Sequence, residues 1–160
     1  MRAVGIILAG GNNSRMKELS RKRAVGAMPI AGSYRAIDFA LSNMSNSHIQ
    51  KVAVLTQYNA WSLNEHLSSS KWWDFGRKQG GLFVFTPSIT SDNGFWYRGT
   101  ADAIAQNIAF LKKSHEPYVV IASADAVYKM DYNKVLEKHV ETGADLTIVC
   151  KNAGDKADVS

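Results

Sequence analysis

The sequence has very few residues that restrain a chain covalently. Its 160 residues include one cysteine and three prolines. The single cysteine, Cys150, excludes an internal disulfide, and its place in an apolar run is typical of a reduced, cytoplasmic protein. We therefore expect a cytoplasmic domain that depends on a hydrophobic core, for which a chain of this length is sufficient.

Long hydrophobic stretches are also missing. The first apolar run, AVGIILA at residues 3–9, is too short to cross a membrane. It leads into a glycine turn with no cleavage-type segment after it, so we interpret it as a core strand and not as a signal peptide. The sequence thus predicts no membrane partner.

Positive charge is in excess, but it is not concentrated. A formal net charge of +5 and a pI of about 9.4 would suit a phosphate-rich partner. The basic residues form only short clusters, at residues 20–23 and 112–113, and such clusters are more typical of a solvated face. We expect no nucleic-acid partner.

What the sequence does contain is an alternation of short apolar runs and helical patterns. Runs of Val, Ile and Leu without polar alternation predict strands that are covered on both faces. The predicted strands are residues 3–9, 51–56, 81–86, 118–123 and 145–150, the predicted helices are residues 35–44, 61–67, 100–113 and 132–142, and the least regular region is 69–95. This order predicts an α/β fold, a mostly parallel sheet with helices on both faces.

In such sheets, ligands bind beyond the carboxyl ends of the strands. The first of these ends reads LAGGNNSR. After Leu8, the glycines Gly10 and Gly11 would let backbone N–H groups approach a phosphate, and Arg15 can pair with phosphate oxygens. The turn is neither a P-loop nor a dinucleotide-binding turn, and composition alone favours a plain strand-to-loop turn.

Five segments, taken together, resemble one enzyme family. They are LAGG..SR, GSYRAIDFALSN, VLTQYN, WYRGTADAIAQN and YKMDY, and they occur in this order. They are similar to the N-terminal catalytic domain of bacterial ADP-glucose pyrophosphorylase, the glucose-1-phosphate adenylyltransferase of glycogen synthesis. The resemblance implies a Rossmann-like nucleotidyltransferase domain that joins ATP and glucose 1-phosphate into ADP-glucose and pyrophosphate with Mg²⁺.

The sequence departs from the active members at the phosphate turn. They read GGxGSRL or GGxGTRL and then AKPAVP, where this chain has GGNNSRM and AVGAMP. Asn13 replaces a glycine, Val25 stands at the position of the catalytic lysine, and Gly26 stands at that of proline. Loss of one fixed donor that stabilises developing phosphate charge typically costs about 3 to 4 kcal/mol. Lys22 and Arg23 are close in sequence, but we expect both to face solvent.

The other motifs of the family are better preserved. The resemblance identifies Asp125, in SADA where the active family has SGDH, as a ligand for Mg²⁺ that binds weakly or not at all, because this ion needs further carboxylates or substrate phosphates. It places Gln57, Gly99 and Thr100 beside the adenine, and Thr100 would also cap the following helix. The predicted nucleotide-binding residues are Leu8, Gly10, Gly11, Gln57, Gly99 and Thr100, and Arg15 is a vestigial catalytic residue.

Two further groups of residues carry weaker signals. The four histidines, at positions 48, 66, 115 and 139, have no partners at metal-binding spacing, so we expect surface or capping roles. The segment KWWDF at residues 71–75 suggests base stacking, but anchoring of a loop or a subunit contact is the better interpretation.

The departures look most like those of GlgD, the regulatory companion of the active subunit. We therefore expect residues 1–160 to be the N-terminal part of a catalytically impaired regulatory subunit, without the left-handed β-helix of the family. The expected partners are ATP or another adenine nucleotide and, in a hetero-oligomer, a catalytic pyrophosphorylase subunit. Binding of glucose 1-phosphate would need the missing C-terminal part. The alternative is an active adenylyltransferase domain whose lysine is supplied from elsewhere.

Overall fold

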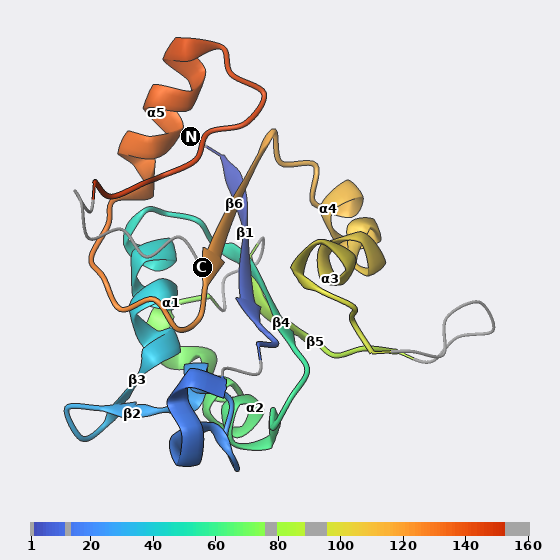
Figure 1. The fold of residues 1–160 in the computed structure, drawn as a ribbon. Helices are drawn as coiled ribbons and strands as arrows, with labels where there is room; N and C mark the ends of the chain where they lie inside the picture. Colours follow the sequence, from blue (N-terminus) through green and yellow to red (C-terminus); the bar gives the residue numbers. More distant parts are fainter. Residues whose placement is uncertain (1, 12–13, 76–79, 89–95, 153–160) are drawn as a thin grey trace.

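The centre of the molecule is a four-stranded parallel sheet (Figure 1). The structure is a computed structural model that describes residues 2–11, 14–75, 80–88 and 96–152. The strands are β1 (Ala3–Ala9), β4 (Lys51–Thr56), β5 (Gly81–Phe85) and β6 (Tyr118–Ser123), in the order β5-β4-β1-β6. Four of the five predicted strands are thereby confirmed.

β1 lies between β4 and β6 and pairs in parallel with both. Ile6 lies opposite Ala53 of β4 on one side and Ile121 of β6 on the other. Val4, Ile6 and Ile7 are fully buried or nearly so, because helices cover both faces of this strand. The unbroken apolar sequence of β1 follows from this double burial.

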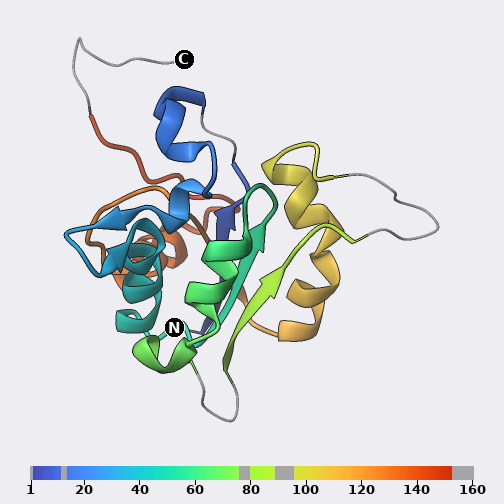
Figure 2. The same ribbon diagram turned by 90° about the horizontal axis from the view of Figure 1, so that it is seen from below.

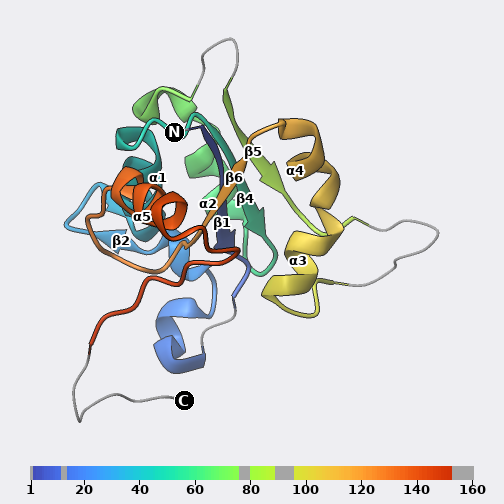
Figure 3. The same ribbon diagram turned by 90° about the horizontal axis from the view of Figure 1, so that it is seen from above.

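Helices pack on both faces of the sheet, as predicted. α1 (Ala36–Asn46), α2 (Trp61–Leu67) and α5 (Tyr132–Thr142) contribute to the core on one face, and α3 (Thr100–Gln106) packs with α4 (Ile108–Ser114) on the other. Figures 2 and 3 show these two layers on opposite sides of the sheet. The remaining elements are the short hairpin strands β2 (Pro29–Ile30) and β3 (Tyr34–Arg35) and the 3₁₀ turns η1 (Ser14–Ser20), η2 (Val25–Ala27) and η3 (Ser70–Trp73).

The prediction of one continuous helix at residues 100–113 is wrong, because the structure has two helices there. Asn107 ends α3 with φ −105° and ψ 16°, and α4 begins after it. The side-chain amide of Asn107 donates to the carbonyl of Ala103 and to the hydroxyl of Tyr97, at 2.9 and 3.0 Å. Asparagine competes with the helix for backbone partners in this way, so the break occurs although the apolar stripe continues across it.

The predicted strand at residues 145–150 does not form. Its residues pair with no strand in the described part of the chain, and Leu146 and Ile148 are 75% and 73% exposed. Thr147 instead meets α5, where its hydroxyl lies 2.8 Å from Nδ1 of His139. Apolar composition identified a segment suited to a sheet, but a strand also needs a hydrogen-bonding neighbour, which these residues lack here.

The irregular region at residues 69–95 is anchored by two aromatic side chains. Trp73 and Phe75 are buried, whereas Trp72, which also belongs to η3, is exposed. This confirms that the KWWDF segment anchors a loop. The region also contains η3 and β5, and its residues 76–79 and 89–95 lie outside the described part of the chain.

A set of hydrogen bonds ties α1 to the segment that leads into α5. The Asn43 amide donates to the carbonyl of Tyr128 at 3.0 Å and accepts from the N–H of Met130 at 3.1 Å. The hydroxyl of Ser47 accepts from the N–H of Tyr132 at 2.9 Å. Two of the segments on which the resemblance rests, DFALSN and YKMDY, therefore hold each other in place.

No helix within the described residues has the length and apolar character needed to cross a membrane.

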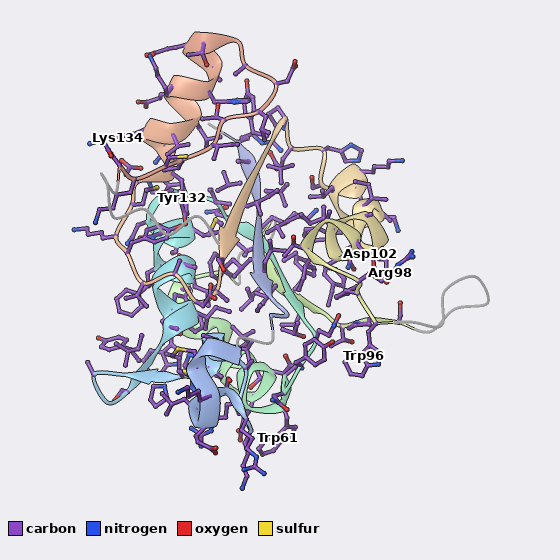
Figure 4. The ribbon with its side chains drawn as sticks, in the orientation of Figure 1. Trp61, Trp96, Arg98, Asp102, Tyr132 and Lys134 are labelled. Carbon is purple, nitrogen blue, oxygen red and sulfur yellow. The ribbon has the colours of Figure 1, made fainter. Side chains whose placement is uncertain are left out.

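Tyr132, at the start of α5, gives the fold a pH-dependent contribution to stability (Figure 4). Its side chain is buried, and its hydroxyl lies 3.1 Å from that of Tyr128. Burial, followed by this hydrogen bond, raises the pKa of Tyr132. A raised pKa stabilises the fold below the ordinary tyrosine pKa of about 10, and this stabilisation is lost as the pH rises above that value.

We predict that Tyr132→Phe flattens the alkaline loss of stability. Between about pH 9.5 and 11.5 the wild-type melting temperature should fall more steeply than that of the variant, because only the wild type must keep a buried phenol neutral. Circular-dichroism melts measure both slopes, and Tyr34→Phe at an exposed position serves as the control. Equal slopes for wild type and Tyr132→Phe would contradict the assignment.

Candidate functional site

A pocket with a volume of about 430 Å³ opens at the carboxyl ends of β1, β4 and β6. Ligands bind at this end of parallel sheets. The lining comes from the three strand ends, from η2 and from the start of α3, and consists of Leu8, Ala9, Gly10, Gly11, Val25, Gly26, Leu55, Gln57, Tyr58, Tyr97, Arg98, Gly99, Thr100, Ala103, Ser123, Ala124 and Asp125. Every predicted site residue except Arg15 therefore lies in one cavity.

The turn after β1 is only partly described. Arg15 belongs to η1, but its side chain lies outside the described residues, and so does Asn13. Gly10 is close to the next strand, since a methyl group at its Cα would lie 3.3 Å from Cβ of Gln57. A methyl group at Gly11 would meet nothing within 4 Å, so this part of the backbone is open toward the pocket.

Gln57, at the end of β4, has an unsatisfied acceptor in the pocket wall. The side chain is only 9% exposed, and its Nε2 donates to the carbonyl of Tyr97 at 3.3 Å. Its Oε1 is buried without a hydrogen-bond partner. A buried polar atom without a partner costs about 1 to 3 kcal/mol, so this oxygen favours a ligand that brings a donor.

Two aromatic residues next to this wall were not among the predicted site residues. Tyr58 lines the pocket, and its ring is parallel to that of Trp96, with centroids 5.6 Å apart. Figure 4 shows Trp96 on the loop that leads into α3. Their proximity to Gln57 and Gly99 in the sequence was the available signal, but their pairing depends on the tertiary fold.

The start of α3 differs from the prediction. Gly99, not Thr100, is the N-cap residue, and the side chain of Thr100 makes no capping hydrogen bond. Asp102 compensates, because its Oδ2 accepts from the N–H of Arg98 and from the Gln106 amide, both at 2.9 Å. A methyl group at Gly99 would meet nothing within 4 Å, so the chain is open to a ligand at this point.

The opposite wall, η2, is held by hydrogen bonds to its main chain. The N–H of Ala24 donates to the carbonyl of Asn59 at 3.3 Å. The guanidinium of Arg35 donates to the carbonyls of Ala27 and Ser62, at 3.2 and 3.4 Å, and so links η2 to α2. Val25, a residue with an aliphatic side chain at the start of this braced turn, lines the pocket.

Arg35 is itself placed by Asp38, which is also hydrogen-bonded to His66. Asp38 Oδ2 accepts from the N–H of Arg35 at 2.9 Å, and Asp38 Oδ1 lies 2.6 Å from Nε2 of His66. His66 therefore has a structural role in the interior rather than the surface or capping role that we expected. His48 lies in the turn after α1, and His115 is the C-cap residue of α4, as a capping role predicts; both have positive φ. No three His, Cys, Asp or Glu side chains of the described residues form a group able to hold a metal ion.

Asp125 lies just beyond the end of β6 and is exposed. It is the one acidic residue in the described pocket lining, and its carboxylate accepts a hydrogen bond from the hydroxyl of Ser123. The protein thus offers a single carboxylate and a neighbouring hydroxyl at this strand end. A hard cation bound here would need oxygen atoms from a ligand as well.

Comparison with known sequences identifies close relatives of this chain. It is 48% identical over 145 residues to a glucose-1-phosphate adenylyltransferase of Clostridium novyi, in an alignment that covers 91% of this chain and 38% of the relative. The corresponding enzyme of Halalkalibacterium halodurans is 47% identical over 145 residues, with the same coverage, and that of Thermosipho africanus is 46% identical over 147 residues, covering 92% and 36%. The chain thus spans well under half the length of these relatives.

The fold also matches a solved structure. A protein of Bacillus anthracis described as a glucose-1-phosphate thymidylyltransferase, in complex with sucrose, superimposes with a TM-score of 0.66 over 87% of this chain and 50% of that one. The two are 20% identical, so this likeness concerns the fold alone. The sequence model of the family described as nucleotidyl transferase matches residues 4–158, and the chain therefore belongs to the nucleotidyl transferase family.

Proposed function

We propose that this chain is an adenine-nucleotide-binding domain of a glycogen-synthesis protein related to glucose-1-phosphate adenylyltransferase, with impaired catalysis. One observation carries the proposal: Val25 lines the pocket at the position where the resemblance expects a catalytic lysine. The site then retains a place for the base and lacks a cation for the phosphates. Such a domain serves a regulatory subunit better than a catalytic one.

The unsatisfied oxygen of Gln57 supports adenine as the base. Because Nε2 is engaged by the carbonyl of Tyr97, the orientation of the amide is determined, and Oε1 is the atom left for the ligand. The 6-amino group of adenine can donate to this oxygen. Guanine presents a carbonyl oxygen at the same place and would leave two acceptors facing each other.

The charges in the pocket lining support impaired phosphate chemistry. Arg98 is the one basic residue among the described lining residues. It precedes α3, whose Ala103 packs on one face of the sheet, whereas η2 packs through Ala27 on the other face. Arg98 thus belongs to the wall opposite Val25, so it is poorly placed to stand in for a cation at that position.

We further propose that Mg²⁺ reaches this site only together with the nucleotide. Asp125 would hold the ion through one carboxylate oxygen, and the phosphates would supply further ligands. Bound in this way, Mg²⁺ neutralises phosphate charge. The residues present fit an ion of this kind only as a shared ligand set, since the described lining contains no second carboxylate.

The proposed partners follow from the same site. The relatives are much longer than the matched region, which covers 38% of the Clostridium novyi enzyme. We propose that glucose 1-phosphate binds only when residues of that further part are present. We also propose that the whole protein is cytoplasmic and that it joins a catalytic pyrophosphorylase subunit in a hetero-oligomer. Adding that subunit and measuring ADP-glucose formation tests the regulatory role, and turnover by this chain alone would contradict it.

We predict that Gln57→Leu weakens ATP binding by about tenfold, because it removes the acceptor for the 6-amino group. Titration calorimetry with ATP and GTP measures the effect. The wild type should prefer ATP, and the variant should lose this preference. Gln106→Leu is the matched control, since Gln106 bonds to Asp102 and does not line the pocket. An unchanged ATP affinity in Gln57→Leu would contradict the assignment of this wall to adenine.

We predict that Val25→Lys creates a preference for ATP over AMP. In the absence of Mg²⁺, the wild-type chain should bind both with similar affinity, whereas a new cation at the phosphates should favour ATP by about tenfold or more. Val25→Met matches much of the length of lysine without its charge and is the control. If the wild type already prefers ATP strongly, or if methionine acts like lysine, the phosphate wall is not the defect that we infer.

We predict that Mg²⁺ alone binds more weakly than about 1 mM, since one carboxylate is a poor site for this ion. Mg²⁺ should nevertheless strengthen ATP binding, and Asp125→Asn should abolish the strengthening. Calorimetry with and without the ion measures both effects. Asp131→Asn, which removes a carboxylate that accepts the N–H of Asn133 at the start of α5, is the control. Equal strengthening in Asp125→Asn would exclude Asp125 as the ligand.

A further inference from the structure

Two segments that line the pocket, η2 and the turn after β6, lie against each other at Gly26 and Ala124. A methyl group built on Gly26 would lie 3.0 Å from Cβ of Ala124, which is tighter than nine in ten real contacts of a Cβ atom. Its next neighbours, the carbonyl oxygen of Ala124 and Cβ of Ile37, would lie at ordinary distances of 3.6 and 3.7 Å. The methyl group of Ala124 is therefore what excludes a side chain at position 26.

The backbone does not require glycine at this position. The described glycines with positive φ are Gly32, Gly81 and Gly143, and Gly26 is not one of them. Gly26 is buried in the 3₁₀ turn η2. Lack of space, and not backbone conformation, is therefore the reason for the glycine.

Both sides of the contact are held firmly. Ala124 is 2% exposed, and its N–H donates to the carbonyl of Leu8 at 3.0 Å, which extends the pairing of β6 with β1. On the other side, Arg35 holds the carbonyl of Ala27. An added methyl group at position 26 would have to push these two supported segments apart.

We propose that the contact between Gly26 and Ala124 sets the distance between two segments of the pocket lining, the segment that carries Val25 and the turn that carries Asp125. The space between them holds one methyl group, which residue 124 supplies. Both residues also line the pocket, and we assign them a positioning role because the contact between them places their neighbours, Val25 and Asp125. The consequence for nucleotide binding rests on the proposed function, but the steric coupling does not.

The coupling predicts that Gly26→Ala changes sign with the residue at position 124. In the wild type, the added methyl group should lower the melting temperature by about 5 °C, because two held segments must separate. In an Ala124→Gly background, the same substitution should raise it by about 2 °C, since the space is now free and alanine restricts the unfolded chain more than glycine does.

Ala122→Gly is the matched control for this cycle. Ala122 is a buried alanine in β6, two residues before Ala124, and none of the three atoms nearest to a methyl group at Gly26 belongs to it. Combined with Gly26→Ala, it should leave the loss of melting temperature in place. If Gly26→Ala is destabilising to the same extent in the wild-type, Ala124→Gly and Ala122→Gly backgrounds, the inferred coupling is wrong.

Nucleotide binding tests the positioning role apart from stability. Gly26→Ala should weaken ATP binding severalfold while adenosine binds as before, and the Gly26→Ala, Ala124→Gly double variant should return to within about twofold of wild type. Unchanged ATP binding in Gly26→Ala, in a chain whose wild type binds ATP, would overturn the positioning role. If the wild type binds no ATP, the proposed function fails. The melting temperatures of the single and double variants then decide whether the contact couples η2 to the turn after β6.

Discussion

The parallel pairing of β1 with both β4 and β6 is the constraint on which the whole site depends. Parallel strands end at the same edge of a sheet, so the residues that follow Leu8, Thr56 and Ser123 meet although they are far apart in the sequence. The pocket lies at this edge. Its position is therefore a consequence of strand order, and the helices on either face only decide what its walls contain.

The two walls differ in the way that the packing supports them. On one side, Gln57 and the start of α3 present an unsatisfied acceptor and an open glycine. On the other side, η2 is braced by Arg35 and by the Asp38–His66 pair, yet what it presents to the pocket is the aliphatic side chain of Val25. This firmly held apolar residue is the reason for our proposal that the phosphate chemistry of the domain is impaired.

The sequence predicted those parts of the fold that depend on local pattern. β1, β4, β6 and α5 were expected with the observed bounds, because apolar runs and amphipathic helices have distinct periodicities. The expected burial on both faces is wrong for β6, an edge strand of the described sheet in which Val119 and Ile121 are 43% and 53% exposed. The break at Asn107 was missed, since the hydrogen bond of its side chain to Tyr97 links it to a residue outside the helix. The strand expected at residues 145–150 was wrong because pairing depends on a neighbour, which a local pattern does not reveal.

The site was predictable to a similar extent. Strand ends and motifs identified Gly11, Gln57 and Asp125 as residues that would share a cavity, and they do. Tyr58 was missed because its partner, Trp96, is brought to it by the fold. The capping role expected of Thr100 was wrong, because Asp102 serves the same end of the helix from within its first turn. The sequence therefore did not predict the contact between the distant residues Tyr58 and Trp96, nor the local choice of Asp102 over Thr100.

The central claim is that an adenine nucleotide occupies this pocket with its base against Gln57. The most direct measurement is an NMR titration of ¹⁵N-labelled protein with ATP, following the side-chain amide of Gln57 and the backbone amides of Gly11 and Gly99. We predict saturable shifts in all three, together with slight changes in α5, which lies away from the pocket lining. Shifts confined to other surfaces, or an unaffected Gln57 side chain at saturation, would contradict the account.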